Sequence, residues 1–430
     1  MASVYEAMGT EELDAQIAQL KADVEELRAR GLSLDMARGK PSPEQVDLSR
    51  PMLDVLTSGS DLTDSGVDAG NYGCPDGLPG ARALMADILG VDAANVVLGG
   101  SSSLNIMSDV VLHGWVKGVR GHEPQVLQAQ RSTLKFLCPS PGYDRHFAVS
   151  ANVGFENVPV AMGPDGPDMD EVERLVESDP TVKGIWCVPK YSNPTGITYS
   201  DETVRRMAAL KPAAPDFRVF WDNAYVVHDL TDDPDELLEV FGAVSEAGGS
   251  DLVYEFASTS KVTFPGSGIA CVAASAADAD DLRAWFGVER VCCDKISQLM
   301  HERWLPDAAA VRAHMAKQAR VLRPRFELVE KKLTEGLGEL GCATWSHPKG
   351  GYFVSFDGPE GSAKAIVSLA AELGVKMTGA GATWPYGKDP HDTNIRIAPS
   401  YPSLADLEAA LDVFVACVKL VSARLARAAR

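Results

Sequence analysis

Ser258-Thr259-Ser260-Lys261 follows directly on the apolar run Leu252-Val253-Tyr254-Glu255-Phe256-Ala257. The apolar run predicts a buried strand, so the lysine stands where that strand ends, with hydroxyl groups just before it. Partial burial lowers the pKa of a lysine amine and leaves the amine free to form an imine with an aldehyde. A lysine at the start of a helix is usually solvated, however, so Lys261 alone does not establish this chemistry.

Two polar segments upstream strengthen the interpretation of Lys261 as a reactive group. They are Ser192-Asn193-Pro194-Thr195-Gly196 and Trp221-Asp222-Asn223-Ala224-Tyr225. Apolar runs alternate with helix-like stretches and predict strands at residues 96–98, 133–138, 184–188, 218–222, 252–258 and 269–274. Such alternation is typical of an α/β sheet that is largely parallel, in which ligands collect at the strand ends. The polar segments all fall at those ends.

A possible phosphate site follows the first of these strands. Residues 96–98 lead into Gly99-Gly100-Ser101-Ser102-Ser103, and a helical pattern comes next. A strand, a turn of small residues and a helix N-terminus together present backbone N–H groups and a positive dipole end to a phosphate. The segment is neither a Walker loop nor a G-x-G-x-x-G, and plain helix capping by serine would explain it equally well.

Length and composition predict an ordinary globular protein of about two or three domains. The chain has 430 residues, of which 45% are apolar and 23% charged, and its net charge is -20. This acidic balance argues against nucleic acid and an anionic membrane as partners. The eight cysteines show no spacing typical of zinc, so we expect reduced thiols, no metal and a cytoplasmic protein. Neither a signal peptide nor a run of about 20 apolar residues is visible.

The two ends of the chain depart from the alternating pattern. Near the N-terminus we expect an amphipathic helix with Thr10 as its N-cap and Gly31 as its stop, because apolar residues repeat at helical spacing: Leu13, Ile17, Leu20, Val24 and Leu27. Beyond residue 290 we expect a long helix over 307–337, kinked at Pro324, and then short strands and further helices. This mixture predicts a second, smaller α+β domain.

The polar residues occur in the order used by class I/II aminotransferases, which are pyridoxal-5′-phosphate (PLP) enzymes of fold type I. The chain resembles this family from about residue 39 to its end, on the following residues: Tyr72, Gly100-Ser101-Ser102, Tyr143, Asn193-Pro194-Thr195-Gly196, Asp222, Tyr225, Ser258-x-x-Lys261 and Arg396. Within the family, Arg38-Gly39-Lys40-Pro41, Pro189-Lys190-Tyr191 and the acidic N-terminal helix look most like a divergent bacterial group of aspartate aminotransferases.

The resemblance implies an α/β fold of the type I PLP-dependent transferases, with a largely parallel sheet in a large domain and a smaller α+β domain. We expect residues 56–305 to form the large PLP-binding domain. Residues 306–430 would form the small C-terminal domain, and residues 1–55 would add the N-terminal helix and a substrate loop to it.

The resemblance also implies catalytic roles for three residues. Lys261 would hold the cofactor as an imine and then move a proton between Cα of the substrate and C4′ of the cofactor. Asp222 would pair with the pyridinium nitrogen and keep it protonated, which makes the ring an electron sink. Tyr225, together with Asn193, would hydrogen-bond the 3′ oxygen of the ring.

The remaining family residues would bind the cofactor or the substrate. Tyr143 would stack on the ring, and the phosphate would be bound by Gly100, Ser101, Ser102 and Ser258. Tyr72 would reach the phosphate from a second subunit, which implies a homodimer with a shared active site. Arg396 would grip the substrate α-carboxylate with two hydrogen bonds, beside the backbone of Gly39 and the side chain of Asn193. No motif assigns the cation for the side-chain carboxylate; the candidates are Lys40, Arg290 and Lys295.

One departure from the family pattern concerns the phosphate. Family members usually carry an arginine shortly after the lysine, but the stretch from Lys261 to Ile269 contains none. Neutral donors could hold the phosphate instead, or a cation from elsewhere could replace the arginine. Our hypothesis is Lys190, because it lies close to the Asn193 loop in the sequence.

These observations predict an aminotransferase that moves an amino group from an amino acid, with L-aspartate favoured by family likeness, to 2-oxoglutarate. The cofactor would alternate between PLP and its pyridoxamine form in a two-step exchange. One alternative is another PLP reaction, such as transamination of a different amino acid, β-elimination or decarboxylation. A second is an aminotransferase-like effector-binding module of a transcription regulator, but no room for a DNA-binding region exists before Arg38. An inactive fold is the third, and the joint presence of Lys261, Asp222, Tyr225 and Arg396 argues against it.

Overall fold

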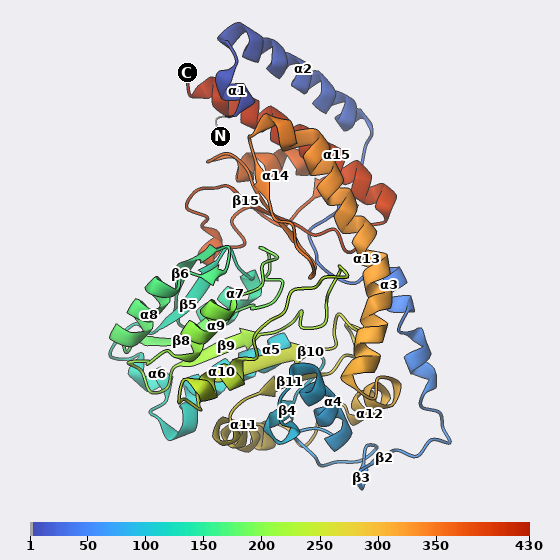
Figure 1. Cartoon of the computed structure of the whole chain (residues 1–430), viewed down its shortest axis with the longest axis vertical. Coiled ribbons are helices and arrows are strands. Elements are labelled where there is room, and N and C mark those ends of the chain that lie inside the picture. The colour runs from blue at the N-terminus through green and yellow to red at the C-terminus, as the bar shows by residue number, and fades with distance from the viewer. Residues whose placement is uncertain (1–2) are drawn as a thin grey trace.

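Figure 1 shows the computed structural model, which describes residues 3–430. The largest sheet lies in the lower part of this view, and helices from both ends of the chain lie together in the upper part. These are α1 (Val4–Ala7), α2 (Thr10–Ala29) and α15 (Leu404–Ala428). The first two residues of the predicted 1–55 segment lie outside the described residues. No helix among residues 3–430 has both the length and the apolar character needed to cross a membrane.

The large sheet contains eight strands in the spatial order β4-β11-β10-β9-β8-β5-β6-β7. Their bounds are β4 (Val96–Leu98), β5 (Lys135–Ser140), β6 (Glu156–Gly163), β7 (Gly166–Pro167), β8 (Val182–Cys187), β9 (Arg218–Asp222), β10 (Val253–Ser258) and β11 (Ala270–Ala273). Neighbours from β10 through β6 pair in parallel, whereas β11 is antiparallel to both of its neighbours and β7 is antiparallel to β6. The predicted α/β fold with a largely parallel sheet is therefore confirmed.

Strands β6 and β7 were not predicted. Strand β6 alternates buried and exposed positions near the sheet edge, so its sequence lacks the continuous apolar run of the central strands. Strand β7 has only two residues, too few to give a periodic pattern.

Helices cover both faces of this sheet, as the alternation of side chains along β9 shows. Val219 and Trp221 pack into the core on one face, and Phe220 packs into the core on the other. The first core is closed by α8 (Met169–Ser178), α9 (Asp201–Ala208) and α10 (Val240–Glu246), and the second by α5 (Ser103–Val116), α7 (Asp144–Val153) and α11 (Ala276–Glu289). Burial on both faces explains why the central strands are apolar throughout.

A separate antiparallel sheet lies in the upper part of Figure 1, in the order β12-β13-β15. It is formed by β12 (Thr344–Trp345), β13 (Val354–Asp357) and β15 (Asn394–Ile397), and it packs with α13 (Ala308–Leu337), α14 (Ala363–Glu372) and α15. The helix α13 continues through Pro324 and reaches down beside the large sheet. The boundaries proposed at residues 55/56 and 305/306 stay a prediction.

The N-terminal segment is attached to this second body. Strand β1 (Leu34–Asp35) pairs in parallel with β14 (Val375–Lys376), and α2 buries Leu13, Ile17, Leu20 and Val24. The N-cap of α2 is Gly9, not the predicted Thr10. The Glu12 side chain accepts a hydrogen bond from the Gly9 amide at 3.4 Å. The helix therefore begins at Thr10, one residue earlier than it would with Thr10 as the N-cap.

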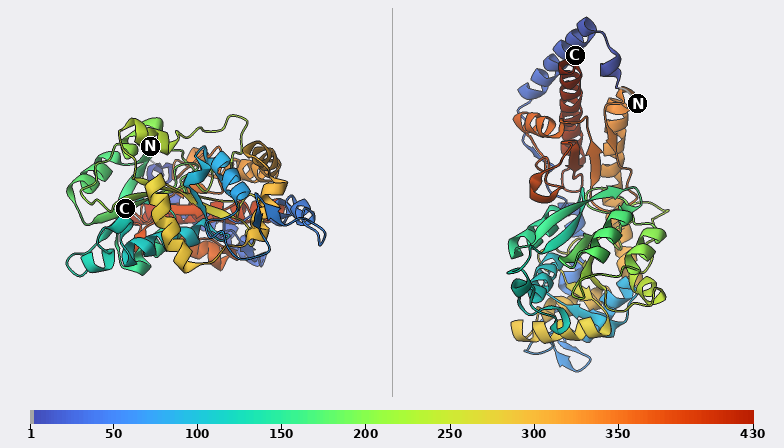
Figure 2. Two further views of the ribbon diagram at one scale, coloured as in Figure 1. Left: turned by 90° about the horizontal axis from the view of Figure 1, so that it is seen from below. Right: turned by 90° about the vertical axis from the view of Figure 1, so that its left-hand side faces the viewer.

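Shorter elements lie around the large sheet. They are α3 (Pro43–Asp47), the hairpin β2 (Thr63–Asp64) and β3 (Val67–Asp68), α4 (Pro79–Leu89), α6 (Gln125–Gln128) and α12 (Lys295–Trp304). Figure 2 shows that the β2–β3 hairpin projects from the end of the molecule opposite to α2.

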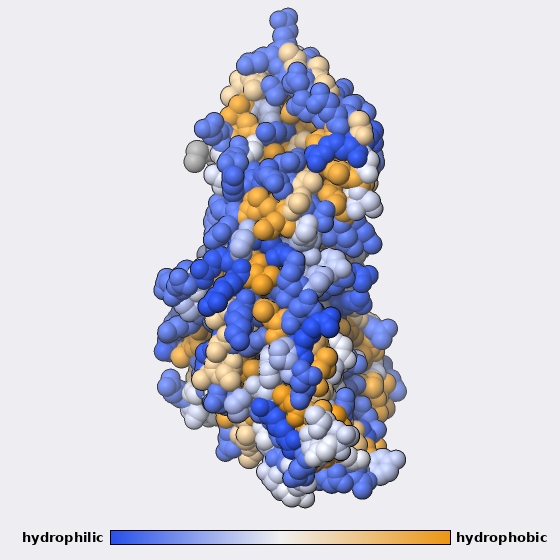
Figure 3. Space-filling model, turned by 90° about the vertical axis from the view of Figure 1, so that its right-hand side faces the viewer, coloured by the Kyte–Doolittle hydropathy of each residue, from blue (hydrophilic) through white to orange (hydrophobic). Residues whose placement is uncertain are grey.

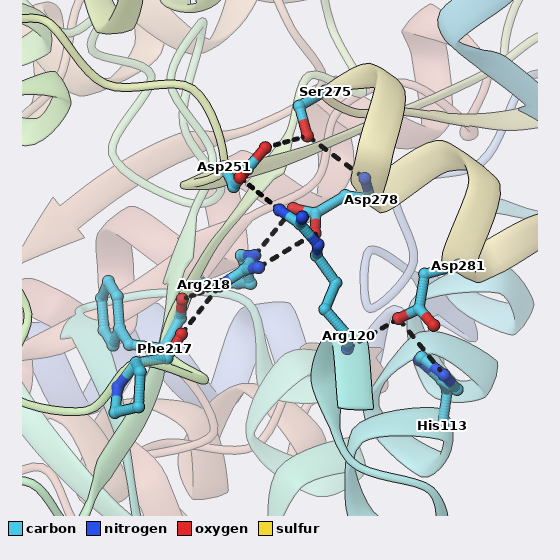
Figure 4. Close-up of polar contacts among 9 residues, drawn as sticks. His113, Arg120, Phe217, Arg218, Asp251, Ser275, Asp278 and Asp281 are labelled. Atoms are coloured by element: carbon cyan, nitrogen blue, oxygen red, sulfur yellow. Dashed lines mark hydrogen bonds and ion pairs between the residues drawn. The ribbon is translucent and has the colours of Figure 1, made fainter. Parts of the chain in front are cut away.

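A buried charge network ties the amino ends of β9 and β10 to α11 (Figure 4). Arg218, the first residue of β9, forms two hydrogen bonds with the Asp278 carboxylate at 2.8 and 2.9 Å, and the two side chains are 4% and 0% exposed. Arg120 pairs with Asp251, which also accepts a hydrogen bond from Ser275 at 2.6 Å. This network fixes the edge of the sheet that lies away from the polar strand ends.

Candidate active site

The parallel strands β4, β5, β8, β9 and β10 direct their carboxyl ends to one edge of the sheet. The loop after each of these strands carries residues that the sequence singled out. Register places Phe256 of β10 opposite Asp222 of β9, so the turn that carries Lys261 lies next to Asp222. Five loops separated widely in sequence therefore converge at one place.

Lys261 lies half-buried in the turn that follows β10. Its Nζ atom is 5.1 Å from the centroid of the Tyr225 ring. Burial lowers the pKa of this amine below the usual lysine value, and the negative charge of Asp222 opposes part of that shift. A larger fraction of Lys261 is therefore the free amine at neutral pH than for an exposed lysine.

His301 of α12 contacts both sides of the Lys261 turn. This residue was not predicted from the sequence. Its Nε2 atom lies 3.0 Å from Oγ1 of Thr259 and 2.8 Å from Oγ1 of Thr263, and its Nδ1 atom lies 2.7 Å from the Ser297 carbonyl. Burial lowers the pKa of His301, so the ring is neutral. In the tautomer that satisfies these contacts, Nδ1 donates to Ser297 and Nε2 accepts from the threonine hydroxyls. The His301 imidazole thus fixes Thr259 and Thr263, one on each side of Lys261 in the sequence.

Asp222 ends β9 and is only 3% exposed. Its Oδ2 atom lies 2.9 Å from Nε2 of His146, whose ring stacks on Trp186 with centroids 4.5 Å apart. The other oxygen, Oδ1, is buried and has no hydrogen-bond partner among residues 3–430. A buried acceptor without a donor is costly, so this oxygen suits a ligand that brings an N–H group. His146 and Trp186 give no signal in the sequence.

Two tyrosines border the space between Lys261 and Asp222. Tyr225 is 2% exposed, and its burial together with the charges nearby raises its phenol pKa well above the usual value. Burial, with the charge of Asp222, raises the pKa of Tyr143 to about 12, and the ring packs edge-on against His146 with centroids 4.9 Å apart. Both phenols therefore stay protonated and can donate hydrogen bonds at neutral pH.

The candidate phosphate loop is joined to the Lys261 turn through hydroxyl groups. Ser258 Oγ lies 3.2 Å from Ser260 Oγ, which donates to the Ser101 carbonyl at 2.6 Å. Ser102 is the N-cap residue of α5, but its side chain makes no capping hydrogen bond. Plain capping therefore does not account for this serine, and its hydroxyl is available to a ligand. Gly100 is exposed, and a side chain there would meet open space.

Arg396 of β15 brings the second sheet into the site. Its Nη1 atom donates to Asp144 Oδ1 at 3.1 Å and to Asn193 Oδ1 at 3.2 Å, and its guanidinium lies 4.8 Å from the Phe353 ring centroid. Gly39 packs on that ring so closely that a Cβ atom would be 2.3 Å from it, which requires glycine. The structure thus brings Gly39, Asn193 and Arg396 together, as the sequence predicted for a substrate site.

Tyr72 lies outside this cluster of residues. Its side chain is 81% exposed, and its carbonyl accepts a hydrogen bond from Lys295 at 3.3 Å. The predicted contact with a phosphate of another subunit would need a second copy of the chain.

Comparison with known proteins identifies the family to which this arrangement belongs. The aspartate amino-transferase family matches residues 8–429, nearly the whole chain. The chain belongs to the aspartate aminotransferase family. It is 42% identical over 408 residues to an aspartate aminotransferase of Corynebacterium glutamicum, covering 94% of this chain and 93% of that protein. A Mycolicibacterium smegmatis protein described as an aminotransferase is 46% identical over 424 residues, covering 97% and 98% of the two chains.

Solved structures agree with this assignment. The crystal structure of an aspartate transaminase from C. glutamicum superposes with a TM-score of 0.95 at 41% identity, over 99% of both chains. An α-aminoadipate aminotransferase from Thermus thermophilus, at 20% identity and a TM-score of 0.73, shares the fold. This member of the aspartate aminotransferase family is therefore an enzyme of the aminotransferase class, with the fold that the sequence predicted.

Proposed function

We propose that the chain is a pyridoxal-phosphate aminotransferase that takes the amino group of L-aspartate and passes it to 2-oxoglutarate. The proposal rests on two groups that lie at the ends of neighbouring strands, the Lys261 amine and the Asp222 carboxylate. Lys261 offers an amine with a lowered pKa, and Asp222 offers a buried carboxylate oxygen without a partner. The aspartate part rests on the likeness to the C. glutamicum aspartate aminotransferase.

The residues present fit PLP, because each polar part of that cofactor meets a complementary group. Asp222 Oδ1 would accept the ring N–H and keep the nitrogen protonated, while Tyr225 and Asn193 would hydrogen-bond the ring oxygen. Gly100, Ser101, Ser102 and Ser258 would hold the phosphate at the start of α5, and Tyr143 would pack on the ring. When bound, the cofactor supplies an acceptor for the electrons of the broken Cα–H bond.

The chain's own groups then perform the binding and the proton transfer. Arg396 would hold the substrate α-carboxylate with paired hydrogen bonds beside Asn193. The Lys261 amine would take the Cα proton and return it to the cofactor carbon. His301 keeps that amine in place through Thr259 and Thr263. The reverse sequence with 2-oxoglutarate would restore the starting state and complete a two-step cycle.

Absorbance spectroscopy of the purified protein tests this function. We expect a visible band from bound PLP that L-aspartate converts to the near-ultraviolet band of the pyridoxamine form, and 2-oxoglutarate should restore the visible band. Aromatic amino acids are the matched comparison. If they react well while aspartate hardly reacts, the substrate part of the proposal is wrong. Pyruvate and ammonia released without an oxo acid acceptor would instead indicate β-elimination.

We further propose a homodimer in which Tyr72 reaches the phosphate of the partner. Tyr72 is one of several large apolar side chains that are exposed in the single chain; the others include Leu53, Val288 and Val291. A dimer contact would cover exposed apolar side chains of this kind. Figure 3 shows apolar patches between hydrophilic ones on one face of the molecule.

Lys190 remains our hypothesis for the cation that replaces the usual phosphate-binding arginine. Its Nζ atom is held by Asp229 Oδ1 at 2.8 Å and the Val226 carbonyl at 3.3 Å. Burial lowers the pKa of His228 to about 3, and the neighbouring side chains of Lys261 and Lys190 contribute to this shift. A cation thus stands near the lysine turn.

Replacing Lys190 by methionine should weaken PLP binding about tenfold, because a charge-assisted hydrogen bond to the phosphate would be lost. Fluorescence titration of the apoprotein with PLP measures the dissociation constant. The double variant Lys190→Met/Asp229→Asn controls for the carboxylate left without its partner. Unchanged affinity would discard the hypothesis. Loss of affinity in Arg290→Met alone would assign the cation to Arg290, whose guanidinium donates to the Leu98 carbonyl at 2.7 Å beside the phosphate loop.

A further inference from the structure

Arg396, the residue that we propose for the substrate α-carboxylate, already forms an ion pair with the carboxylate of Asp144. Asp144 is the first residue of α7 and follows Tyr143 directly. Its Oδ1 atom lies 3.1 Å from Arg396 Nη1. We propose that Asp144 is a built-in competitor for the substrate α-carboxylate, which must displace it from Arg396 before the substrate can bind. This inference rests on the proposed function, because it requires Arg396 to be the carboxylate site.

The ion pair with Asp144 does not satisfy all the hydrogen-bond donors of the Arg396 guanidinium. A single nitrogen, Nη1, carries both the Asp144 and the Asn193 contacts, and Nη2 reaches Thr378 Oγ1 only at 3.4 Å. The Nε atom is buried and has no hydrogen-bond partner within residues 3–430. A free carboxylate that approaches two of these nitrogens side by side would form a stronger, two-pronged contact than Asp144 does. Substrate can therefore win the competition.

The two partners differ in their freedom to move. The Arg396 side chain is 8% exposed and lies against the Phe353 ring, whereas the Asp144 side chain is 35% exposed. Asp144 stands in the first turn of α7, where the helix dipole stabilises its negative charge even when the ion pair is broken. We therefore expect Arg396 to stay in place while the Asp144 carboxylate turns toward solvent.

This competition has a use in the empty enzyme. Asp144 is the only carboxylate among residues 3–430 that forms an ion pair with Arg396, so without it the buried guanidinium would lose its paired charge until the substrate arrives, which is costly. The internal carboxylate holds Arg396 oriented and partly neutralised, and it favours ligands able to supply a better carboxylate. Asp144 thereby sets the affinity for the α-carboxylate at this end of the site.

The test is the affinity of the loaded enzyme for maleate, an unreactive dicarboxylate, measured by isothermal titration calorimetry. Asp144→Asn should bind maleate about fivefold more tightly than the parent, the size expected for removal of a partly exposed ion pair. The KM for L-aspartate should fall in the same direction. Weaker binding of maleate by Asp144→Asn would overturn the inference, because it would mean that Asp144 supports Arg396 in its bound position.

The same Asp144→Asn substitution in an Arg396→Lys protein distinguishes competition at Arg396 from the general loss of a negative charge. In Arg396→Lys the two-pronged site is lost, so the gain from Asp144→Asn should shrink to less than about twofold. An equal gain in both backgrounds would overturn direct competition at Arg396. If the parent neither binds maleate nor responds to L-aspartate in its absorbance spectrum, the proposed function fails and this inference falls with it. A normal spectral response without tighter binding in Asp144→Asn removes the inference alone.

Discussion

Lys261→Ala should lose turnover with L-aspartate by about ten-thousand-fold or more, because the variant lacks the amine that we propose as the carrier of the Cα proton. Its amine lies 5.1 Å from the Tyr225 ring centroid in the turn after β10, and His301 contacts Thr259 and Thr263 on the two sides of Lys261. Lys261 is the only lysine among residues 3–430 in the turn that follows β10, residues 259–268. Rapid mixing with L-aspartate, followed by absorbance, measures the loss.

Lys261→Arg is the matched control for this prediction. It keeps a positive charge and a long side chain at the position, but a guanidinium is protonated at all relevant pH values and cannot accept a proton. Both variants should therefore be inactive while still binding PLP through Asp222 and the phosphate loop. Turnover within about tenfold of the parent in either variant would contradict the role assigned to Lys261.

The convergence of Lys261, Asp222 and Asn193 could be predicted because all three fall at the ends of apolar strands. Lys261, Asp222 and Asn193 each follow such a run, and parallel strands must bring these ends to one edge. The substrate-binding role of Arg396 is a prediction that rests only on family resemblance. Arg396 lies in a second sheet, and nothing in the residues near it indicates which strand ends it will face.

The partners that hold these residues could not be predicted. His146 reaches Asp222 from 76 positions away in the sequence, and His301 reaches Thr259 from 42 positions away. Each gives an ordinary helical pattern in its own segment, because a histidine on the buried side of a helix satisfies the same periodicity as any core residue. Asp144 likewise resembles a first-turn helix residue, and only the fold places it 3.1 Å from Arg396.

The buried ion pair of Arg218 and Asp278, at the opposite edge of the sheet, also joins residues far apart in the sequence, and its loss should have the largest effect on stability. Arg218→Met should lower the free energy of unfolding by about 3–5 kcal/mol, because it leaves the Asp278 carboxylate buried without its partner. The Asp278 side chain is 0% exposed, and Arg120 Nε, at 3.8 Å, is too far away to replace the two hydrogen bonds from Arg218, so Arg120 offsets only part of the loss (Figure 4). The Phe217 carbonyl also loses a hydrogen bond of 2.7 Å. Urea titration followed by circular dichroism measures the change.

Two comparisons show whether burial causes this effect. Arg206→Met removes ion pairs with Glu173 and Asp170, but Arg206 is 31% exposed and its partners are 34% and 87% exposed, so we expect a loss of at most about 1 kcal/mol. Arg218→Met/Asp278→Leu removes both buried charges and should recover most of the stability, because the penalty comes from one unpaired carboxylate and not from loss of the pair itself. Equal losses in Arg218→Met and Arg206→Met would contradict the argument. A double variant as unstable as Arg218→Met would show instead that packing around β9, and not charge, sets the stability of this edge.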